Sequence, residues 1–348
     1  MTPSRILLVY TGGTIGSEED PDTGALRPLN FDHLRNRVPE VEGLEAELEF
    51  ESLAPIDSSD MTPDRWSELA RLLHLRRDRY DGFVVLHGTD TMSYTASALS
   101  FMLPDFGKPV VLTGSQLPIG VLRTDGKENL LTAIEIAAKW DSGDLQRGPL
   151  VREVVIYFGD ELLRGNRAHK QDAEGFQAMT SPNFPALAEV GVHVRFRRDL
   201  LLRPVGEPGL RVDIETNVTV VHLHPGLTAA ALRHQLSQPG LRAAILRTYG
   251  SGNAPRNADF LAVLAEAQER GVFMVNVTQC TVGSVDANRY VTGAGLTRLG
   301  VEPSLDITLE AALTKLMVLA AEEPTREGLR AAFKRDLAGE QTPADLIR

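Results

Sequence analysis

Hydroxyl, carboxylate and amine side chains of the types that carry acyl transfer occur in several short polar motifs of this 348-residue sequence. A threonine hydroxyl is a poor nucleophile until a neighbouring base removes its proton. Thr14 and Thr89 supply two hydroxyls, and Asp90 supplies an orienting carboxylate. Lys170 would supply the base if it is buried, because burial disfavours the charged form of an amine. This set is sufficient for acyl transfer, but composition and spacing do not choose the substrate.

The first motif, TGGTIG at residues 11–16, contains Thr14. Its two adjacent glycines allow the backbone to turn sharply and to approach a ligand closely, which would present the Thr14 hydroxyl as a nucleophile. The alternative interpretation is a tight turn in which this hydroxyl satisfies local backbone groups. The spacing matches neither G-x-G-x-x-G nor the G-K-[ST] of a phosphate loop, so the motif gives only weak support to nucleotide binding.

Two further motifs suit a small carboxylate or another anion. HGTDTM at residues 87–92 places hydroxyls and a carboxylate at the predicted start of a helix, where an anion can bind. Asp90 or Thr89 would cap that helix in the alternative interpretation. DSSDM at residues 57–61 offers serines and backbone N–H groups to a carboxylate, or forms a polar loop before the next helix. His87 alone is assigned a structural role.

Seven apolar runs without strict alternation predict strands that are buried on both faces of a sheet. They are residues 6–10, 83–86, 110–112, 154–158, 218–223, 243–246 and 272–277. Glycine or small polar residues follow most of these runs. Because ligands of a parallel sheet bind at the carboxyl ends of its strands, the polar motifs are expected to gather there.

Helical patterns lie between many of these strands. They cover residues 63 to about 77, 91–103, 125–140, 258–270 and 307–321. Asp125 and Asp306 are the expected N-caps of two of these helices. Strands that alternate with helices predict an α/β fold with a mainly parallel sheet.

Two domains are expected, because a chain of this length exceeds the size at which one core usually stops growing. The segment around residues 195–215 is rich in prolines, glycines and charges, which is typical of a boundary. We therefore expect a larger N-terminal α/β domain at residues 1–196, a linker at residues 197–215 and a smaller C-terminal α/β domain at residues 216–348.

The net charge and the cysteine content indicate which partners and which cellular compartment fit this chain. The formal net charge of −11 repels phosphate backbones and disfavours nucleic acid as a partner. Cys280 has no second cysteine to pair with, which fits a reducing compartment. The N-terminal apolar run, about five residues long, is too short for a secretory signal core, and no stretch approaches the roughly 20 apolar residues of a membrane span. We therefore expect a cytoplasmic protein without a membrane partner.

Metal chemistry is not expected. The eight histidines are scattered through the chain. His222 and His224 share one face of a predicted strand, but no third ligand is evident, so a structural role is favoured. The sequence has neither a C-x-x-C pair nor a G-x-S-x-G nucleophile elbow.

Several motifs that occur in a fixed order resemble the asparaginase family. They are YTGGTIGS at residues 10–17, DSSDMTP at 57–63, HGTDTM at 87–92, LTGSQLP at 112–118, RTDGKENL at 123–130, RGNRAHK at 164–170 and YGSGNAP at 249–255. The resemblance runs through nearly the whole chain, and ordered motifs are far more specific than any one of them. RGNR and NVTQC are similar to the type I, cytoplasmic branch in particular.

The resemblance implies two α/β domains and the hydrolysis of L-asparagine to L-aspartate and ammonia through a threonine acyl-enzyme, with no cofactor. By position, Thr14 would be the nucleophile. Thr89, Asp90 and Lys170 would form the supporting triad. Thr89 would also contact the substrate.

The resemblance further implies how the substrate is held. Ser58, with Asp57 and Ser59 nearby, would bind the α-carboxylate. Asp90 would pair with the α-ammonium. Asn253 resembles a residue that a neighbouring subunit contributes in such enzymes, so a homodimer or homotetramer is implied.

Two departures from the family pattern bear on activity and regulation. Family members often carry a tyrosine in the loop after GGTIG that orients the nucleophile, but residues 17–30 contain none, which leaves the catalytic rate open. The Gly, Asp and Pro residues of this loop are typical of a mobile lid. Arg247 and Cys280 match residues near a second, allosteric asparagine site of some type I members, whereas His169 replaces a threonine there. Cys280 would alternatively be a buried core thiol.

Three alternative functions stay open at this point. A glutaminase-asparaginase or broader amidase differs by one substrate methylene, which is worth only about 1–3 kcal/mol of discrimination. A transfer-RNA-dependent amidotransferase subunit would carry an extra N-terminal module, whereas this chain is expected to begin at its first strand. A non-catalytic amino-acid-binding relative is favoured by the missing tyrosine and disfavoured by the presence of all four candidate catalytic residues.

Overall fold

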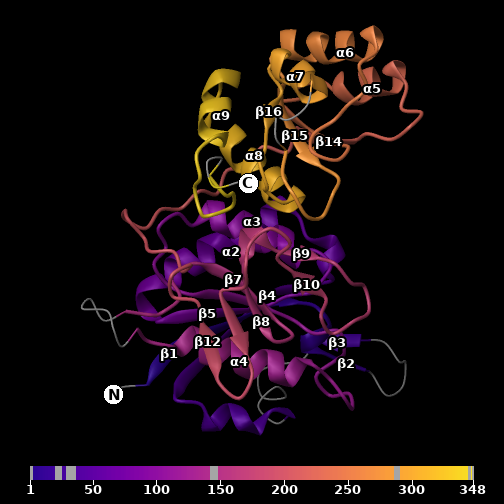
Figure 1. The fold of residues 1–348 in the computed structure, drawn as a ribbon. Helices are drawn as coiled ribbons and strands as arrows, with labels where there is room; N and C mark the ends of the chain where they lie inside the picture. Colours follow the sequence, from indigo (N-terminus) through magenta and orange to yellow (C-terminus); the bar gives the residue numbers. More distant parts are fainter. Residues whose placement is uncertain are drawn as a thin grey trace. The chain divides into compact units, whose positions relative to one another are not determined.

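The computed structural model describes residues 3–19, 26–28, 37–141, 148–285 and 291–343, together with residue 346. It divides into two compact units, Met1–Val212 and Asp213–Arg348, and each unit is a sheet covered by helices (Figure 1). The predicted two-unit α/β fold is confirmed. The predicted linker at residues 197–215 straddles the division between the units, and its own bounds stay a prediction.

The first unit contains, among the described residues, an eight-stranded sheet in the order β12-β11-β8-β7-β6-β5-β1-β4. The strands from β4 at one edge to β7 run parallel to one another: β4 Ala46–Ile56, β1 Ser4–Gly12, β5 Gly82–Leu86, β6 Val110–Thr113 and β7 Val154–Phe158. The antiparallel strands β8 Glu161–Arg164, β11 Ala188–Val190 and β12 Val194–Phe196 extend one edge. The carboxyl ends of β1, β4, β5 and β6 therefore lie along the same edge of the sheet.

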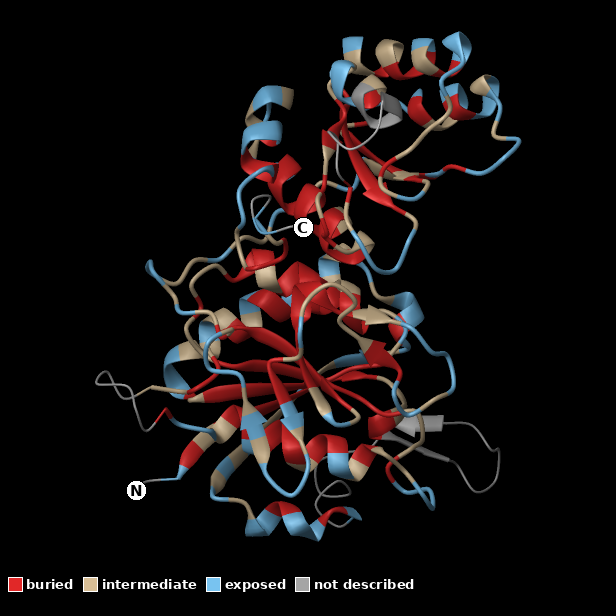
Figure 2. Ribbon diagram, viewed as in Figure 1, coloured by how far each residue is buried: buried red, intermediate tan, exposed pale blue. Residues whose placement is uncertain are grey.

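Helices cover both faces of this sheet (Figure 1). α2 Pro63–Arg76 and α3 Met92–Met102 lie on one face, and α4 Gly126–Ala138 lies on the other. The alternating side chains of β1 explain this arrangement, because Ile6 and Leu8 pack with Leu130 and Ile134 of α4 while Leu7 is buried on the opposite side. The burial colours of Figure 2 show the central strands of the sheet as a buried layer between the helices.

One strand of this sheet escapes the sequence pattern. β4 alternates between apolar residues that pack against the core, such as Leu48 and Phe50, and exposed charged residues such as Glu47 and Glu49. That alternation is typical of a strand with one wet face. It places β4 at the edge of the sheet, beside β1.

The second unit contains a four-stranded parallel sheet within the described residues, in the order β13-β14-β15-β16. The strands are β13 Val218–His222, β14 Ala243–Thr248, β15 Phe273–Thr278 and β16 Glu302–Pro303. The helices are α5 Ala229–Leu236, α6 Ala258–Glu269, α7 Val291–Arg298, α8 Leu309–Glu322 and α9 Arg326–Phe333. α5 and α6 share a hydrophobic core with one face of the sheet. Phe333 of α9 contacts Phe273 on the other face.

The two predicted N-caps do not use their side chains as expected. Asp125 occupies the N-cap position of α4 but makes no side-chain capping hydrogen bond. α8 is capped by Thr308, whose hydroxyl accepts a hydrogen bond from the N–H of Ala311 at 3.2 Å. Asp306 instead accepts hydrogen bonds from the backbone and hydroxyl of Thr342 at 2.7 and 2.6 Å. Asp125 accepts hydrogen bonds from the backbone N–H groups of Gln116 and Leu117, so in both cases a group outside the helix start uses the carboxylate.

Within the described residues, none of the helices combines the length and the apolar character that crossing a bilayer requires.

Candidate active site

The turn after β1 is pressed against two neighbouring strand ends. Gly12 and Gly13 have φ angles of 118° and 87°, a region that only glycine adopts without strain. A Cβ at Gly12 would lie 1.9 Å from the carbonyl oxygen of Ile56, and one at Gly13 would lie 2.3 Å from the nitrogen of Gly88. Only glycine therefore fits at both positions. Thr14 follows directly, as the first residue of the short helix η1 Thr14–Gly16.

The second and third motifs meet at the same place. A Cβ at Gly88 would lie 2.4 Å from Ser58 Oγ and 3.4 Å from Gly13 Cα. The polar motifs at residues 11–16, 57–61 and 87–92 therefore converge at the carboxyl ends of β1, β4 and β5. This is the edge of a parallel sheet at which ligand sites form.

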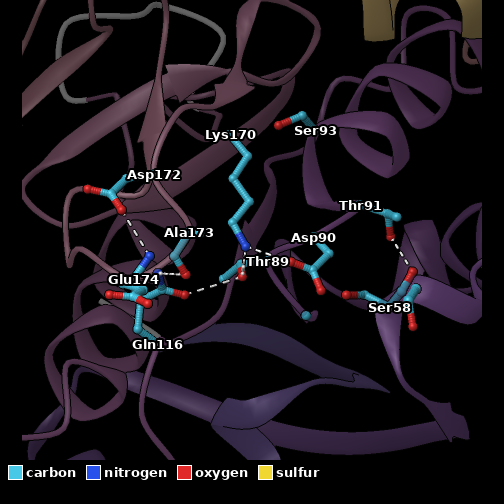
Figure 3. Close-up of polar contacts among 12 residues, drawn as sticks. Ser58, Thr89, Asp90, Thr91, Ser93, Gln116, Lys170, Asp172, Ala173 and Glu174 are labelled. Carbon is cyan, nitrogen blue, oxygen red and sulfur yellow. Dashed lines mark hydrogen bonds and ion pairs between the residues drawn. The ribbon is translucent and has the colours of Figure 1, made fainter.

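Lys170 joins this edge from a distant part of the chain (Figure 3). It lies on the short strand β9 His169–Lys170. Its Nζ donates hydrogen bonds to Thr89 Oγ1 at 2.8 Å and to Asp90 Oδ1 at 2.6 Å. The Lys170 side chain is 18% exposed and that of Asp90 is 62% exposed. Three of the four candidate catalytic residues are thus in direct contact, with the carboxylate open to an incoming ligand.

Helix α3 begins differently from the prediction. Its N-cap residue is Thr91, and no side chain makes a capping hydrogen bond there. The predicted capping by Asp90 or Thr89 is therefore wrong, because both side chains bind Lys170 instead. The Thr91 hydroxyl donates to the carbonyl oxygen of Ser58 at 2.7 Å, which ties two of the motifs together.

The two serines of the motif at residues 57–61 differ in environment. Ser58 is 4% exposed and faces Gly88. Asp57 and Ser59 are exposed, and Asp57 Oδ1 accepts hydrogen bonds from the N–H and the hydroxyl of Ser59, both at 2.8 Å. These hydrogen bonds lower the pKa of Asp57. The polar groups of Asp57 and Ser59 thus hydrogen-bond to each other. Ser58 is the residue of this motif that lies against the motifs at residues 11–16 and 87–92.

A buried tyrosine holds the turn that carries Thr14. The Tyr10 hydroxyl donates to the carbonyl oxygen of Gly16 at 2.7 Å, and this hydrogen bond is buried. Gly16 packs so closely on the ring that a Cβ there would lie 2.3 Å from a Tyr10 ring carbon. The ends of η1 are therefore fixed by Tyr10 on one side and by Gly13 on the other. Sequence reasoning assigned no role to Tyr10.

His87 is fully buried and fully engaged. Its Nδ1 lies 2.7 Å from the carbonyl oxygen of Gly88, and its Nε2 lies 2.9 Å from Thr95 Oγ1. Trp66 Nε1 donates to the same Thr95 oxygen at 3.0 Å, which leaves the Thr95 hydrogen to point at His87. Burial lowers the pKa of His87 to about 4. A neutral imidazole without a free nitrogen is a structural residue, as the sequence analysis proposes.

This environment predicts a pH-dependent contribution of His87 to stability. The unfolded chain binds a proton at His87 below its ordinary pKa of 6.5, while the folded chain stays neutral there until about pH 4. The folded state is therefore destabilised as the pH falls through this window, by up to about 3 kcal/mol. His87→Gln has no imidazole to protonate, so it lacks this pH-dependent loss of stability. Urea denaturation of both proteins should show their unfolding free energies converging between pH 6.5 and pH 4.5, and a constant difference would contradict the assignment.

Gln116 is a further member of the cluster, and sequence reasoning gave it no role. Its Oε1 accepts a hydrogen bond from the Thr89 hydroxyl at 3.3 Å. The one signal in the sequence is its place in LTGSQLP, directly after a predicted buried strand.

Asn253 lies in the second unit, at the carboxyl end of β14. The backbone groups of Tyr249 and Asn253 form hydrogen bonds in both directions, at 2.9 and 2.8 Å. Asn276 Nδ2 donates to the carbonyl oxygen of Gly252 at 3.0 Å, and the Thr278 hydroxyl donates to that of Gly250 at 2.5 Å. These contacts hold the loop that carries Asn253 in one conformation.

The residues matched to a second site occupy both units. His169 lies on β9 of the first unit. In the second unit, the Arg247 guanidinium donates to the carbonyl oxygens of Thr278 and Gln279, both at 3.3 Å. Cys280 is exposed, so the alternative of a buried core thiol is wrong.

His222 and His224 are both exposed, and no grouping of three or more His, Cys, Asp or Glu suited to a metal ion occurs within the ranges that the structure describes.

In the expected lid, β2 Ser17–Glu19 and β3 Leu26–Pro28 pair antiparallel. The other residues of the lid, 20–25 and 29–30, lie outside the described residues.

Comparison with known proteins places this geometry in a family. Residues 5–202 match the family model for "Asparaginase, N-terminal", and residues 217–333 match that for "Glutaminase/Asparaginase C-terminal domain". L-asparaginase 1 of Escherichia coli strain K12 is 44% identical over 352 residues, which cover 99% of this chain and 100% of the relative.

Two solved structures are similar along their whole length. The crystal structure of L-asparaginase I from Vibrio cholerae has 39% sequence identity and a TM-score of 0.87, with 98% of this chain and 100% of the other covered. The thermostable L-asparaginase from Thermococcus kodakarensis has 34% identity and a TM-score of 0.89, with the same coverage of 98% and 100%. Since both family models match in order and the polar motifs meet at one sheet edge, the chain belongs to the asparaginase family.

Proposed function

We propose that this protein hydrolyses L-asparagine to L-aspartate and ammonia. The observation that carries the proposal is the contact of Lys170 with Thr89 and Asp90, beside the glycine turn that leads into Thr14. Its support from relatives is the 44% identity with an L-asparaginase over the full chain.

Thr14 is the proposed nucleophile. Its hydroxyl attacks the side-chain amide carbon of asparagine, and its proton leaves with the departing ammonia. The product of this step is an ester between Thr14 and the aspartyl group. Water then attacks the ester, releases aspartate and returns a proton to the threonine oxygen. Backbone donors beside the glycine turn would stabilise the oxyanion, and each such donor is typically worth about 100- to 1000-fold in rate.

Thr89 and Lys170 are the proposed relay for the protons of both steps. Lys170 Nζ lies 2.8 Å from Thr89 Oγ1, within the distance over which a proton is transferred. Asp90 lies 2.6 Å from the same amine and orients it. A hydroxyl next to an amine can pass a proton inward or outward, which both the acylation and the deacylation steps require.

The substrate is a zwitterion, and the site offers a complementary group for each end. The Asp90 carboxylate, 62% exposed, is proposed to pair with the α-ammonium. The Ser58 hydroxyl, with Asp57 and Ser59 on either side of it, is proposed to bind the α-carboxylate. Thr89 lies between these groups in the chain and is proposed to contact the substrate as well.

Ammonia release from asparagine and from glutamine, each over a concentration series, tests the proposal. We expect turnover of asparagine well above that of a Thr14→Ala control. No release above the control would leave a non-catalytic amino-acid-binding protein as the function. Comparable kcat/KM for glutamine would indicate a glutaminase-asparaginase, because one methylene is worth only about 1–3 kcal/mol.

The same concentration series tests the second site proposed at His169, Arg247 and Cys280. A sigmoidal dependence on asparagine would support activation by the substrate. A hyperbolic dependence in the wild type would remove the role of this second site.

We expect the protein to be a homodimer or homotetramer. The reason is Asn253, which is proposed to reach the substrate of a neighbouring subunit from its fixed loop at the end of β14. Light scattering with in-line activity measurement checks this expectation. A strictly monomeric and fully active protein would contradict the role given to Asn253.

The proposal involves no cofactor, no nucleic acid and no membrane, and it places the enzyme in the cytoplasm. Its support is the acidic net charge of −11 and a cysteine content that fits a reducing compartment.

A further inference from the structure

The side-chain amide of Gln116 can adopt only one orientation in this structure (Figure 3). Its Nε2 donates to the carbonyl oxygens of Ala173 and Gly175, at 3.2 and 3.1 Å. Rotation of the amide by 180° would place Oε1 against these two acceptors, which would leave both contacts repulsive. Oε1 must therefore face Thr89, and the only hydrogen available between the two oxygens is that of the Thr89 hydroxyl.

The backbone of Gln116 is held as firmly as its amide. Its N–H donates to both carboxylate oxygens of Asp125, at 3.1 and 3.0 Å, and the N–H of Leu117 donates to Asp125 at 3.2 Å. Asn129 donates to the same carboxylate at 3.2 Å and to the carbonyl oxygen of Gly114 at 2.9 Å. This explains why Asp125 does not cap its helix with its side chain.

Gln116 and Lys170 hold Thr89 from two sides. Lys170 donates to Thr89 Oγ1, and Thr89 donates to Gln116. The amide of Gln116 then binds the backbone of residues 173 and 175, which follow Lys170 closely in the chain. The result is a closed ring of contacts from Lys170 through Thr89 and Gln116 back to the segment that carries Lys170. Residues 171–174 are exposed, and the amide of Gln116 binds this segment at the carbonyl oxygen of Ala173.

We propose that Gln116 is a positioning residue that sets the direction of the Thr89 hydroxyl hydrogen. This inference rests on the proposed function. With its hydrogen directed at Gln116 and one lone pair accepting from Lys170, Thr89 has one lone pair left for the substrate or for water. Thr89 is thereby prepared to accept a proton. A relay through Lys170 then requires the Thr89 hydroxyl to break its hydrogen bond to Gln116 and rotate toward the amine. The hydrogen bond to Gln116 therefore also controls how readily Thr89 gives up its own proton.

Two substitutions separate this role from simple packing. Gln116→Met keeps the length of the side chain but removes both the acceptor and the donors. Gln116→Glu keeps an acceptor for Thr89 and removes the donors to residues 173 and 175. The control is Gln177→Ala, which removes another glutamine of the same segment whose amide donates to Asp160 at 3.1 Å and does not contact Thr89.

The expected result is a loss in kcat without a matching change in KM. The hydrogen bond to Thr89 is long, at 3.3 Å, so we expect Gln116→Met to lower kcat by about tenfold, with KM within about threefold of wild type. Gln116→Glu keeps the acceptor for Thr89 but sets its second oxygen against the carbonyl oxygens of Ala173 and Gly175, so it should recover only part of kcat. Gln177→Ala should leave both constants unchanged.

The solvent isotope effect supplies a readout that packing alone would not change. If Gln116 sets the direction of the Thr89 hydroxyl hydrogen, its loss slows the proton transfer through Thr89. The ratio of kcat in H2O to kcat in D2O should therefore rise in Gln116→Met, whereas a change in packing alone should leave the wild-type ratio.

Wild-type kcat in Gln116→Met would overturn the proposal. Equal losses in Gln116→Met and Gln116→Glu with an unchanged isotope effect would also overturn it, since that result means packing only. A crystal structure of Gln116→Met does not depend on turnover. If the wild-type protein released no ammonia from asparagine, the proposed function would fail, while the conformation of the Thr89 side chain in that structure would still decide whether Gln116 positions Thr89.

Discussion

Replacing Lys170 with methionine is expected to lower kcat for asparagine by about 100- to 10,000-fold, the range typical of a lost acid or base. Methionine has a similar length but no amine, so the contacts at 2.8 Å with Thr89 and at 2.6 Å with Asp90 are both lost. The Thr89 hydroxyl would then have no partner to which it can pass a proton. Neither acylation nor deacylation could proceed at its normal rate.

The fold should tolerate this change. Asp90 is 62% exposed, so water solvates its carboxylate once the amine is gone. Solvent-exposed ion pairs typically contribute about 0.2–1 kcal/mol, and the carboxylate of this pair is exposed. The midpoint of urea denaturation should therefore stay close to that of the wild type while activity is lost.

Lys108→Met is the matched control for this experiment. Lys108 is 21% exposed, close to the 18% of Lys170, and it lies 3.8 Å from the carboxylate of Asp81. Lys108 precedes β6 Val110–Thr113, so it lies at the amino end of this strand, away from the candidate site. We expect normal kcat in this variant. Near-wild-type rates in Lys170→Met would remove the lysine from the mechanism.

The core strands of this fold are predictable from local sequence, because strands buried on both faces are continuous apolar runs. β5 Gly82–Leu86 and β7 Val154–Phe158 lie where such runs predict them. β4 Ala46–Ile56 is missed because it alternates between exposed and partly buried residues at the sheet edge. Short strands such as β11 Ala188–Val190 are missed because they have too few residues to show any period.

The candidate site is predictable only in its parts. Each motif is visible because polar residues follow a buried strand, but the contact between Lys170 and Thr89 joins residues 81 positions apart, which no local pattern encodes. For the same reason the capping of α3 by Asp90 is predicted wrongly, since the distant Lys170 takes its carboxylate. Gln116 is missed because its role exists only once Thr89 and residues 173–175 are brought beside it.

The position of Thr14 gives the second large expected effect. Thr14→Ala removes the proposed nucleophile, and kcat should fall by at least about 1000-fold, as it does when the nucleophile of a covalent mechanism is removed. The turn itself should persist. Its shape is set by the positive φ angles of Gly12 and Gly13 and by the buried hydrogen bond from Tyr10 to Gly16, none of which involves the Thr14 hydroxyl.

Thr14→Ser is the matched control, because serine keeps the hydroxyl and loses only a methyl group. We expect it to retain measurable turnover where Thr14→Ala retains none. Rapid quenching of the wild type with asparagine, followed by peptide mass spectrometry, should find the aspartyl adduct on the peptide that contains Thr14. Thr89 is another hydroxyl at this edge of the sheet, and it lies 2.8 Å from Lys170. An adduct on Thr89, together with normal rates in Thr14→Ala, would show that Thr89 and not Thr14 is the nucleophile. The dependence on Lys170 would then remain, since the amine would activate Thr89 directly.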